Sequence, residues 1–517
     1  MKKLSYAVIV ACFLMTWAQA QSHVRVYTET KHDVSLPLRD MAKTVAVQKT
    51  LNHEVENHQG GLPVKDSGVT DSAQAASVNG LRPLVGTTAG LNFDGQAADG
   101  VAPPDTTGAV GATQYVQWVN LEYNVYSKTT GSKILGPVQG NAFWSGFGGT
   151  CSTSNSGDPI VLYDKAAGRW FAAQNTFSGV YTICLAVSTS NDATGTYNRY
   201  SFAVSPSTNF PDYPKWGVWS DGYYQSFNAF KNGSSFNGSE VCAADRTNIL
   251  AGNAATIQCF STSTTYGGLL PGDIDGNTAP PAGEAETYAD WSDTTHINFW
   301  KFHVDFVTPT NSTFTGPTQV SVPSFTQVCS SGTRACIPEG AGEKVDSLGD
   351  RLMYRLAYRN FGSYESLLVS QTVKPTSGTA VSAVRWYEFR NPSAVSLYQS
   401  GTFQDSGTKN YWMPSIAQDK QGNIALGFSV ANKTTDPSVW YTGRLVTDAL
   451  GTMQSANTVV TGTGYQTSTG NRWGDYSTMQ VDPSDDCTFW YTQEYYKTKG
   501  SYNWATRINS FKFTGCN

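Results

Sequence analysis

The chain repeats a short pattern in which an apolar segment, a turn that usually contains Asp, and an aromatic-rich segment follow one another. Clear copies are VLYDKAAGRWFAA (161–173) and IAQDKQGNIALGFS (416–429). The turns of seven copies lie 52 to 73 residues apart and are centred on Ala112, Asp164, Asp221, Asp293, Asp346, Asp419 and Asp482. This spacing suits one four-stranded sheet per repeat, so it predicts an all-β chain folded as a β-propeller.

We expect a single propeller domain over residues 89–517, with about seven four-stranded blades and with six or eight as alternatives. Segment 264–284 is rich in Gly and Pro, and we expect it to be a loop between the third and fourth blades. The predicted blades span residues 101–140, 156–206, 212–263, 285–323, 341–392, 396–447 and 455–516.

The N-terminus has the features of an export signal. Lys2 and Lys3 precede the apolar stretch 7–17, and Ala18-Gln19-Ala20 offers a small-x-small cleavage site. A lipoprotein signal ending at Cys12 is the alternative, which the apolar run beyond Cys12 disfavours. We therefore expect residues 1–20 to be a signal peptide, residues 21–88 a flexible leader or propeptide, and the protein to be secreted or periplasmic, without transmembrane anchoring.

Eight cysteines remain after the expected signal peptide, and they follow one another as close neighbours. Their spacing resembles neither a zinc knuckle nor a redox CxxC motif, and disulfides persist in an oxidising compartment. We predict sequential pairing: Cys151 with Cys184, Cys242 with Cys259, Cys329 with Cys336, and Cys487 with Cys516.

The charge of the chain excludes some partners. The formal net charge is −5, and the Lys and Arg residues are scattered. Nucleic-acid binding needs a dense basic face, so we expect no nucleic-acid partner. No dinucleotide-binding, P-loop or haem-attachment motif is present, so we expect no required cofactor, and we expect a monomer.

The candidate functional residues precede the predicted turns, where the innermost strands of a propeller begin and converge on the central channel. Carboxylates combined there with aromatic rings and cations suit a sugar site. The candidate catalytic carboxylates are Asp105, Asp158, Glu343 and Asp475, for which the alternative is a role in capping turns. The candidate substrate-binding residues are Tyr213, Lys215, Trp412, Arg472 and Trp473.

Two further groups have alternative interpretations. Asp273, Asp275 and Asn277 occupy alternate positions, as in a calcium-binding loop, although the same residues also form ordinary turns. Arg351, Arg355 and Arg359 have even spacing on one predicted strand, and we expect them to form salt bridges between sheets.

The strand–Asp–turn–strand units resemble secreted bacterial β-propeller proteins of the sialidase-like, BNR-repeat kind over roughly residues 90–516. The resemblance is one of architecture, because the Ser-x-Asp-x-Gly-x-x-Trp box of sialidases is not reproduced. It implies a glycosidase, a polysaccharide lyase or a glycan-binding module.

Two functions follow from these observations. The first is a carbohydrate-active enzyme, a glycoside hydrolase or polysaccharide lyase, which acts on a polysaccharide or glycoconjugate through carboxylates at the propeller funnel. The second is a lectin-like or adhesive propeller that binds a glycan or protein without catalysis. Two carboxyl groups flanking an open pocket would favour the enzyme, whereas burial of these groups would favour the binding protein. A protease-like or inhibitory factor is disfavoured because the chain has only six histidines.

Overall fold

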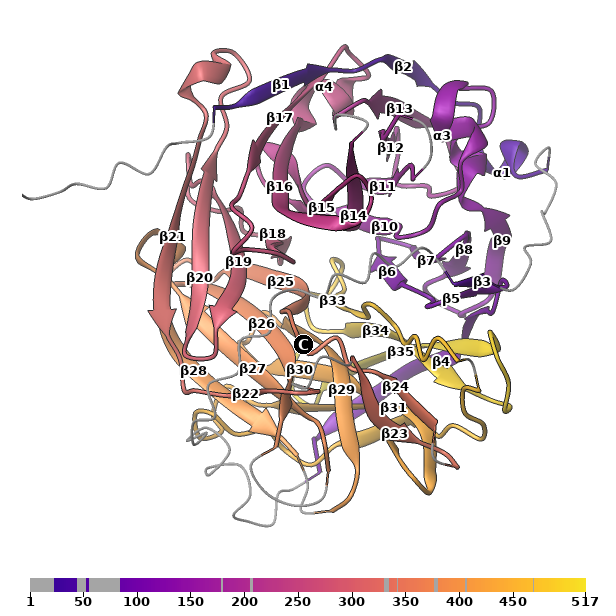
Figure 1. Ribbon diagram of the computed structural model, residues 1–517, viewed down its shortest axis with the longest axis vertical. Helices are drawn as coiled ribbons and strands as arrows, with labels where there is room; N and C mark the ends of the chain where they lie inside the picture. The colour runs from indigo at the N-terminus through magenta and orange to yellow at the C-terminus, as the bar shows by residue number, and fades with distance from the viewer. Residues whose placement is uncertain are drawn as a thin grey trace, which may run out of the picture.

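The computed structural model shows an all-β chain whose sheets surround a central axis (Figure 1). Within each blade, neighbouring strands run antiparallel, from an innermost strand at the axis to an outermost strand at the rim. The structure describes residues 23–43, 53–54, 84–177, 180–204, 208–329, 334–341, 343–375, 380–404, 407–467 and 469–517. The predicted signal peptide therefore lies outside the described residues.

The first three blades follow one another along the chain. Blade 1 contains β6 (Thr106–Val110), β7 (Gln114–Val119), β8 (Glu122–Ser127) and β9 (Lys133–Gln139). Blade 2 contains β10 (Ile160–Asp164), β11 (Arg169–Asn175), β12 (Ile183–Ser188) and β13 (Tyr197–Phe202). Blade 3 contains β14 (Asn209–Val218), β15 (Gly222–Lys231), β16 (Ser235–Asp245) and β17 (Thr256–Ser261).

Blades 4 and 5 share one sheet, because their innermost strands β18 and β25 pair in parallel. Blade 4 contains β18 (Leu270–Asp275), β19 (Glu286–Asp293), β20 (His296–His303) and β21 (Thr313–Ser321). Blade 5 contains β25 (Met353–Asn360), β26 (Glu365–Lys374), β27 (Ala383–Arg390) and β28 (Ser396–Phe403), and β22 (Thr326–Gln327) also pairs with β26.

The last two blades complete the ring. Blade 6 contains β29 (Asn410–Gln418), β30 (Ile424–Asn432), β31 (Thr435–Arg444) and β32 (Asn457–Val460). Blade 7 contains β33 (Thr478–Val481), β34 (Phe489–Tyr496) and β35 (Trp504–Phe513), and its outermost strand is β4 (Thr87–Ala97), from before blade 1. The pairing of β4 with β35, visible in Figure 1, closes the ring, so the predicted count of seven blades is confirmed.

Short elements lie outside the seven blades. The hairpin of β23 (Ala335–Glu339) and β24 (Glu343–Asp346) precedes blade 5, and β3 (His53–Glu54) pairs in parallel with β5 (Val101–Ala102). The helices are α1 (Leu38–Met41), α3 (Gly149–Thr153), α4 (Arg246–Ala251), η1 (Gly140–Trp144), η2 (Pro309–Asn311) and η3 (Pro392–Ala394). No helix among the described residues is long and apolar enough to cross a membrane.

The N-terminal segment differs from the predicted flexible leader where the structure describes it. Strand β1 (Arg25–Thr28) pairs with β17, and β2 (Lys31–Val34) pairs with β13. The two strands add a fifth strand to blades 3 and 2, and in Figure 1 they lie along the rim of these blades. They cover sheet edges whose backbone groups would otherwise lack partners, which explains why this segment is ordered.

Two of the seven predicted turns are not the first hairpin of a blade. The first hairpin of blade 4 joins β18 to β19, before Asp293, and Asp346 ends β24 before blade 5 begins. Segment 264–284, predicted as a loop, contains β18. Its sequence LPGDID has the Pro, Gly and Asp residues of a turn, but pairing with β19 and β25 on its two sides makes it a strand.

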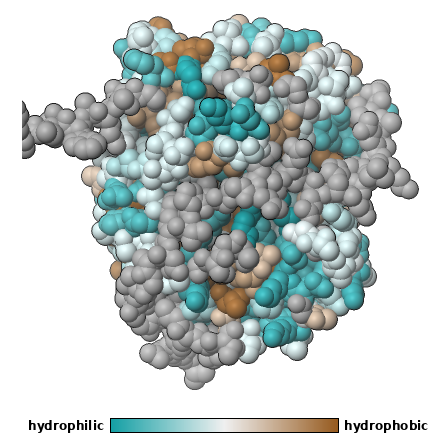
Figure 2. Space-filling model, viewed as in Figure 1, coloured by the Kyte–Doolittle hydropathy of each residue, from teal (hydrophilic) through white to brown (hydrophobic). Residues whose placement is uncertain are grey.

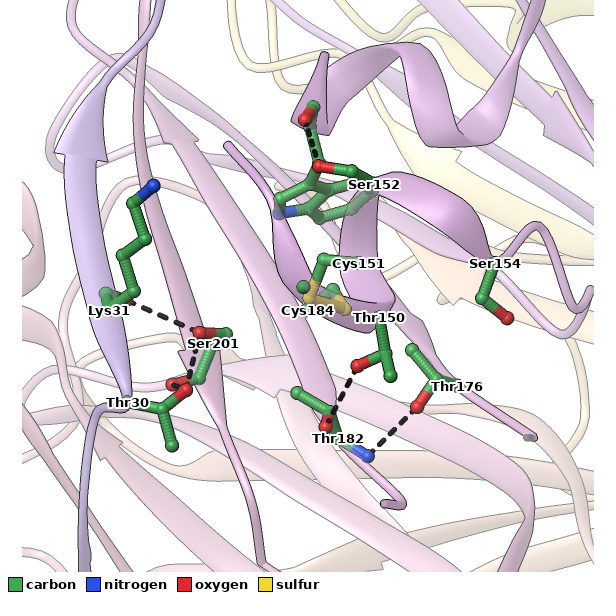
Figure 3. The surroundings of a disulfide bond; sticks show 12 residues. Thr30, Lys31, Thr150, Cys151, Ser152, Ser154, Thr176, Thr182, Cys184 and Ser201 are labelled. Carbon is green, nitrogen blue, oxygen red and sulfur yellow. Dashed lines mark hydrogen bonds between the residues drawn. A yellow bond between two sulfur atoms is a disulfide. The ribbon is translucent and has the colours of Figure 1, made fainter. Parts of the chain in front are cut away.

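All four predicted disulfides are present: Cys151–Cys184, Cys242–Cys259, Cys329–Cys336 and Cys487–Cys516. Figure 3 shows the first, which fastens α3 to strand β12 of blade 2. The Thr150 hydroxyl contacts that of Thr182 at 3.2 Å, and the Thr182 amide donates to Thr176 Oγ1 at 3.0 Å. These bonds attach the blade 1–blade 2 connection to the ring.

Aromatic rings fill the spaces between neighbouring blades. Phe171 of blade 2 contacts Trp216 of blade 3, and Tyr441 of blade 6 stacks on Phe511 of blade 7. Burial of these aromatic side chains contributes apolar stabilisation between neighbouring blades. On the coloured part of the face viewed in Figure 2, which is seen along the propeller axis, hydrophobic residues form small patches among polar ones.

Candidate functional site

The innermost strands of five blades begin with an unusual backbone conformation. A non-glycine residue with positive φ lies at or just before the start of each strand or at its bulge: Asp105 (49°), Asp158 (50°), Tyr213 (55°), Met413 (53°) and Asp475 (56°). This region disfavours residues with a Cβ atom, and such residues concentrate at functional sites. Three of the five are candidate catalytic carboxylates.

The carboxylates of blades 1 and 2 contact each other. The side chains of Asp105 and Asp158 share a hydrogen bond. Asn120 Nδ2 donates to Asp105 Oδ2 at 2.6 Å, and the backbone amide of Tyr213 donates to Asp158 Oδ2 at 3.1 Å. The exposed fractions are 0% for Asp105 and 5% for Asp158, so the pair is almost completely shielded from water.

Asp475 also belongs to this cluster and lies in the segment just before β33, the innermost strand of blade 7. The amide of Asp105 donates to the carbonyl of Gly474 at 3.0 Å, which fixes the first blade against the last. Arg472 Nη2 donates to Asp475 Oδ1 at 2.7 Å, and Arg334 Nη2 lies 4.0 Å from the same oxygen. The guanidinium groups therefore surround Asp475 but not Asp105.

Lys215 enters the cluster between two aromatic rings. Its Nζ atom lies 3.4 Å from the ring centroid of Tyr213 and 3.9 Å from that of Tyr476, and it donates to the Pro214 carbonyl at 2.9 Å. The guanidinium carbon of Arg351 lies 4.4 Å from the Tyr213 centroid. Cation–π contacts of this kind strengthen when they are desolvated, and Lys215 is fully buried.

The surroundings of the three carboxyl groups shift their pKa values in different directions. Burial raises the pKa of Asp105 well above its usual value, and the charges of Asp158 and Asp475 add to the effect. Burial also raises the pKa of Asp158. Burial opposes ionisation of Asp475 too, but Arg472, Arg334 and Arg351 outweigh it and lower the pKa. Within one site, the pKa of Asp105 is thus shifted upward and the pKa of Asp475 downward.

Two neighbouring groups titrate near neutrality. Burial, together with the charges of Asp158 and Asp475, raises the pKa of Asp212 to about 7. Burial lowers the pKa of Lys215 to about 7, although nearby carboxylates oppose the change. A cluster with groups poised in this range can exchange protons with a substrate.

The structure brings together six of the nine predicted catalytic and substrate-binding residues: Asp105, Asp158, Tyr213, Lys215, Arg472 and Asp475. The other three lie elsewhere. Glu343 is exposed on β24, where its charge acts on Glu339 and Lys499. Trp412 and Trp473 are both 0% exposed and pack against each other with ring centroids 5.3 Å apart. They form part of the core and present no ring to a sugar.

Several residues of the cluster were not predicted. Arg351 precedes β25 and contacts Tyr213 and Asp350, whereas the sequence interpretation placed it in a salt bridge between sheets. Arg334 and Asp346, at the two ends of the β23–β24 hairpin, pair at 2.7 Å beside Asp475. Tyr476 directly follows Asp475 in the sequence, so an aromatic ring beside a candidate carboxylate could have identified it as a member of the cluster.

The predicted calcium ligands bind cationic side chains instead. Arg355 Nε donates to Asp273 Oδ2 at 2.6 Å, and its Nη2 donates to Asp275 Oδ1 at 3.0 Å. Lys165 Nζ also donates to Asp275 Oδ1, at 2.9 Å. Asn277 is exposed in the following turn. The two carboxylates are thus already neutralised, and this arrangement suits a guanidinium rather than a calcium ion.

Arg359 pairs with Asp486 of the β33–β34 turn at 2.6 Å. The expected salt bridge between sheets is therefore confirmed for Arg359, whereas Arg355 pairs with carboxylates of β18, a strand of the sheet that blades 4 and 5 share. Within the described residues, no group of three or more His, Cys, Asp or Glu side chains is arranged to hold a metal ion.

Comparison with known proteins gives remote structural likenesses. No protein-family model and no curated protein matches the chain. The Dos1 propeller is 8% identical, with a TM-score of 0.35, over 82% of this chain and 95% of that chain. The α-L-arabinanase of Penicillium chrysogenum is 9% identical, with a TM-score of 0.34, over 72% and 99%. The GH43 endo-arabinanase of Bacillus licheniformis is 14% identical, with a TM-score of 0.28, over 58% and 96%. Similarities this remote carry no argument about function, so function is inferred only from the geometry of the carboxylate cluster.

Proposed function

We propose that the protein is a glycoside hydrolase that acts on a polysaccharide or glycoconjugate at the Asp105–Asp158–Asp475 cluster. The observation that supports this proposal is the opposite shift of two carboxyl pKa values within one cluster, upward at Asp105 and downward at Asp475. Hydrolysis of a glycosidic bond needs this combination of a carboxylic acid and a carboxylate.

The roles follow from the contacts. Asp105, whose pKa is raised by burial, is the proposed acid that donates a proton to the leaving glycosidic oxygen. Asp475, held ionised by Arg472, activates water or attacks the anomeric carbon. Asp158 shares a hydrogen bond with Asp105 and positions its proton. Tyr213 and Lys215 line the same cluster and complete the substrate-binding side chains.

Elimination of the lyase type is less well supported. It requires a Tyr or Lys base beside a cation that neutralises a uronate, and Tyr213, Lys215 and Arg472 are the candidates for these roles. Burial raises the pKa of Tyr213 far above its ordinary value, so its phenol keeps its proton. A phenol in this state is a poor base at neutral pH.

A non-catalytic propeller that binds a glycan or protein is the second candidate. The observation that favours it is burial, because Asp105, Asp158 and Asp475 are each at most 9% exposed. The base of the β23–β24 hairpin, through Arg334 and Asp346, lies directly beside Asp475. Hydrolysis therefore requires this hairpin base to move aside, whereas a binding protein would need no access to the carboxylates.

The proposal extends to the setting of the enzyme. It is exported by residues 1–20, carries a leader within residues 21–88, and acts as a monomeric propeller over residues 89–517, of the sialidase-like kind in architecture. The four disulfides support an oxidising compartment.

A panel of neutral and acidic polysaccharides tests the proposal, with released reducing ends as the readout. We expect the full chain to release sugar from at least one polymer and Asp158→Asn to lower this release strongly. Asp40→Asn, at an exposed carboxylate of α1, is the matched control and should keep full activity. Absence of turnover on every polymer, with binding retained, would favour the non-catalytic propeller.

Replacement of Lys215 should change the pH dependence of the reaction. The positive charge of Lys215 favours ionisation of Asp158 and also interacts with Asp475, the proposed ionised carboxylate. Lys215→Met should therefore raise both pKa values and move the acid limb of the kcat/KM profile upward by about 1 pH unit. A pH–rate profile of both proteins checks this. A lower rate with an unchanged profile would show that Lys215 acts only in packing.

A further inference from the structure

A pocket of about 280 Å³ lies on the opposite side of the ring from the carboxylate cluster. The cluster gathers at the starts of innermost strands, whereas this pocket is formed where β10, β14 and β18 end. These three strands are neighbours around the axis in Figure 1. The walls are residues 163–166 of blade 2, residues 218–220 and Arg246 of blade 3, and Ile274 with residues 276–279 of blade 4.

The charges in the wall are balanced pair by pair. Arg246 donates two hydrogen bonds to Asp164, at 2.7 and 2.9 Å, and Lys165 pairs with Asp275 at 2.9 Å. Both oxygens of Asp164 receive a further donor, from Tyr223 Oη and the Ala167 amide. The pocket therefore offers neither the net positive charge that attracts an anion nor a free carboxylate oxygen that binds a metal ion.

Hydrogen-bond donors remain after this pairing. Lys165 Nζ donates to the Ile274 carbonyl and to Asp275, and its third hydrogen has no acceptor among the described residues. Arg246 Nη1 makes one bond, to the Ser220 carbonyl at 3.3 Å. Their side chains are 14% and 15% exposed, so these N–H groups reach the pocket. The hydroxyls of Ser220 and Thr278 are exposed at its edge.

The rest of the lining is mainly apolar. Val218, Trp219 and Ile274 form this part of the wall together with the ring of Tyr163. The Trp219 indole is fixed by its bond to the Glu284 carbonyl at 2.9 Å and by an edge contact with Tyr358. An apolar wall with a few fixed polar groups is typical of small-molecule sites, whose volumes begin at about 300 Å³.

We infer that this pocket binds one neutral sugar residue. Such a ligand has the required features: it is uncharged, its hydroxyl oxygens accept from Lys165 and Arg246, and its C–H groups contact Ile274 and the ring of Tyr163. The site is separate from the carboxylate cluster and does not depend on the hydrolase proposal. It would hold a glycan to the far side of the propeller.

Saturation-transfer NMR and calorimetry with D-glucose, D-galactose, D-xylose and L-arabinose test this inference, with D-glucuronate and inorganic phosphate as charged probes. Ala166→Trp places a large ring at the edge of the pocket, and Ala449→Trp, at an exposed alanine in the turn after β31, is the matched control. We expect at least one neutral sugar to bind, Ala166→Trp to abolish this binding, and Ala449→Trp to preserve it.

The inference and the hydrolase proposal fail in different ways. Sugar binding that persists in Asp105→Asn but is lost in Ala166→Trp would place the ligand in this pocket, whether or not the protein cleaves polysaccharides. If no neutral sugar gives a saturable signal that Ala166→Trp removes, or if only glucuronate or phosphate does, the inference is wrong.

Discussion

Replacing Arg355 with methionine is expected to lower the free energy of unfolding by about 3–5 kcal/mol. Arg355 is 1% exposed and contacts Asp273, Asp275 and the Met479 carbonyl, so it joins blades 4, 5 and 7. Methionine fills a similar volume but leaves two buried carboxylates with Lys165 as their remaining cationic contact. Urea denaturation of the purified variant measures the loss.

Arg507→Met is the matched control for this prediction. Arg507 pairs with Asp94, a carboxylate that is 47% exposed, and surface ion pairs of this kind contribute at most about 1 kcal/mol. Equal losses in the two variants would contradict the importance that we assign to the buried ion pairs between blades.

Lowering the pH should weaken the same ion pairs and reduce the free energy of unfolding. Burial opposes ionisation of Asp275, but Arg355, Lys165 and Arg359 lower its pKa to about 2. The ordinary value in an unfolded chain is about 3.9, so the stabilisation is complete above that pH and is lost as the pH falls toward 2. In Arg355→Met this loss on acidification should be smaller, because the pKa of Asp275 is then closer to its ordinary value.

Replacing Asp475 with asparagine should reduce the rate of glycoside hydrolysis by about 10²–10⁴-fold. Asparagine preserves the shape of the side chain and removes the one carboxylate of the cluster whose pKa is lowered. Without it, the proposed reaction has an acid but no ionised partner. The measurement is kcat on the best polymer of the panel.

The stability of Asp475→Asn must be measured in parallel, because Arg472 loses its partner at 2.7 Å. Asp346 remains 3.9 Å from Arg472 and limits the cost of leaving this buried charge without Asp475. We expect a folded protein that still binds the polymer. Activity close to that of the unaltered chain would contradict the catalytic role of Asp475.

The sequence predicted the parts of the fold that local patterns determine. Asp164, Asp221, Asp419 and Asp482 lie in or beside the first hairpin turns of their blades, and the spacing of the cysteines gave all four disulfides. The convergence of Asp105, Asp158 and Asp475 followed from one rule, that innermost strands begin around a common channel.

The incorrect parts depended on contacts between distant segments. Strand β18 has the local composition of a turn and becomes a strand only through pairing with β25, about 80 residues later, in parallel. Because β18 was not predicted, the predicted blade 4 began one strand too late. Glu343 was likewise assigned to the start of an innermost strand, whereas it begins β24 of a separate hairpin. The burial of Trp412 against Trp473 likewise depends on the packing of blade 6 against blade 7 and leaves no trace in spacing.

The pairing of β4 with β35 has a consequence for biosynthesis. A ribosome releases β4 before any blade and β35 after all the others, so the circle stays an open arc until the last strands emerge. Asp105 precedes the first blade and Asp475 precedes the last blade, so the two residues come together only when the ring of blades closes. A nascent or C-terminally truncated chain would therefore lack the contact that brings the proposed acid–base pair together, so activity of the proposed enzyme would appear only after synthesis is complete.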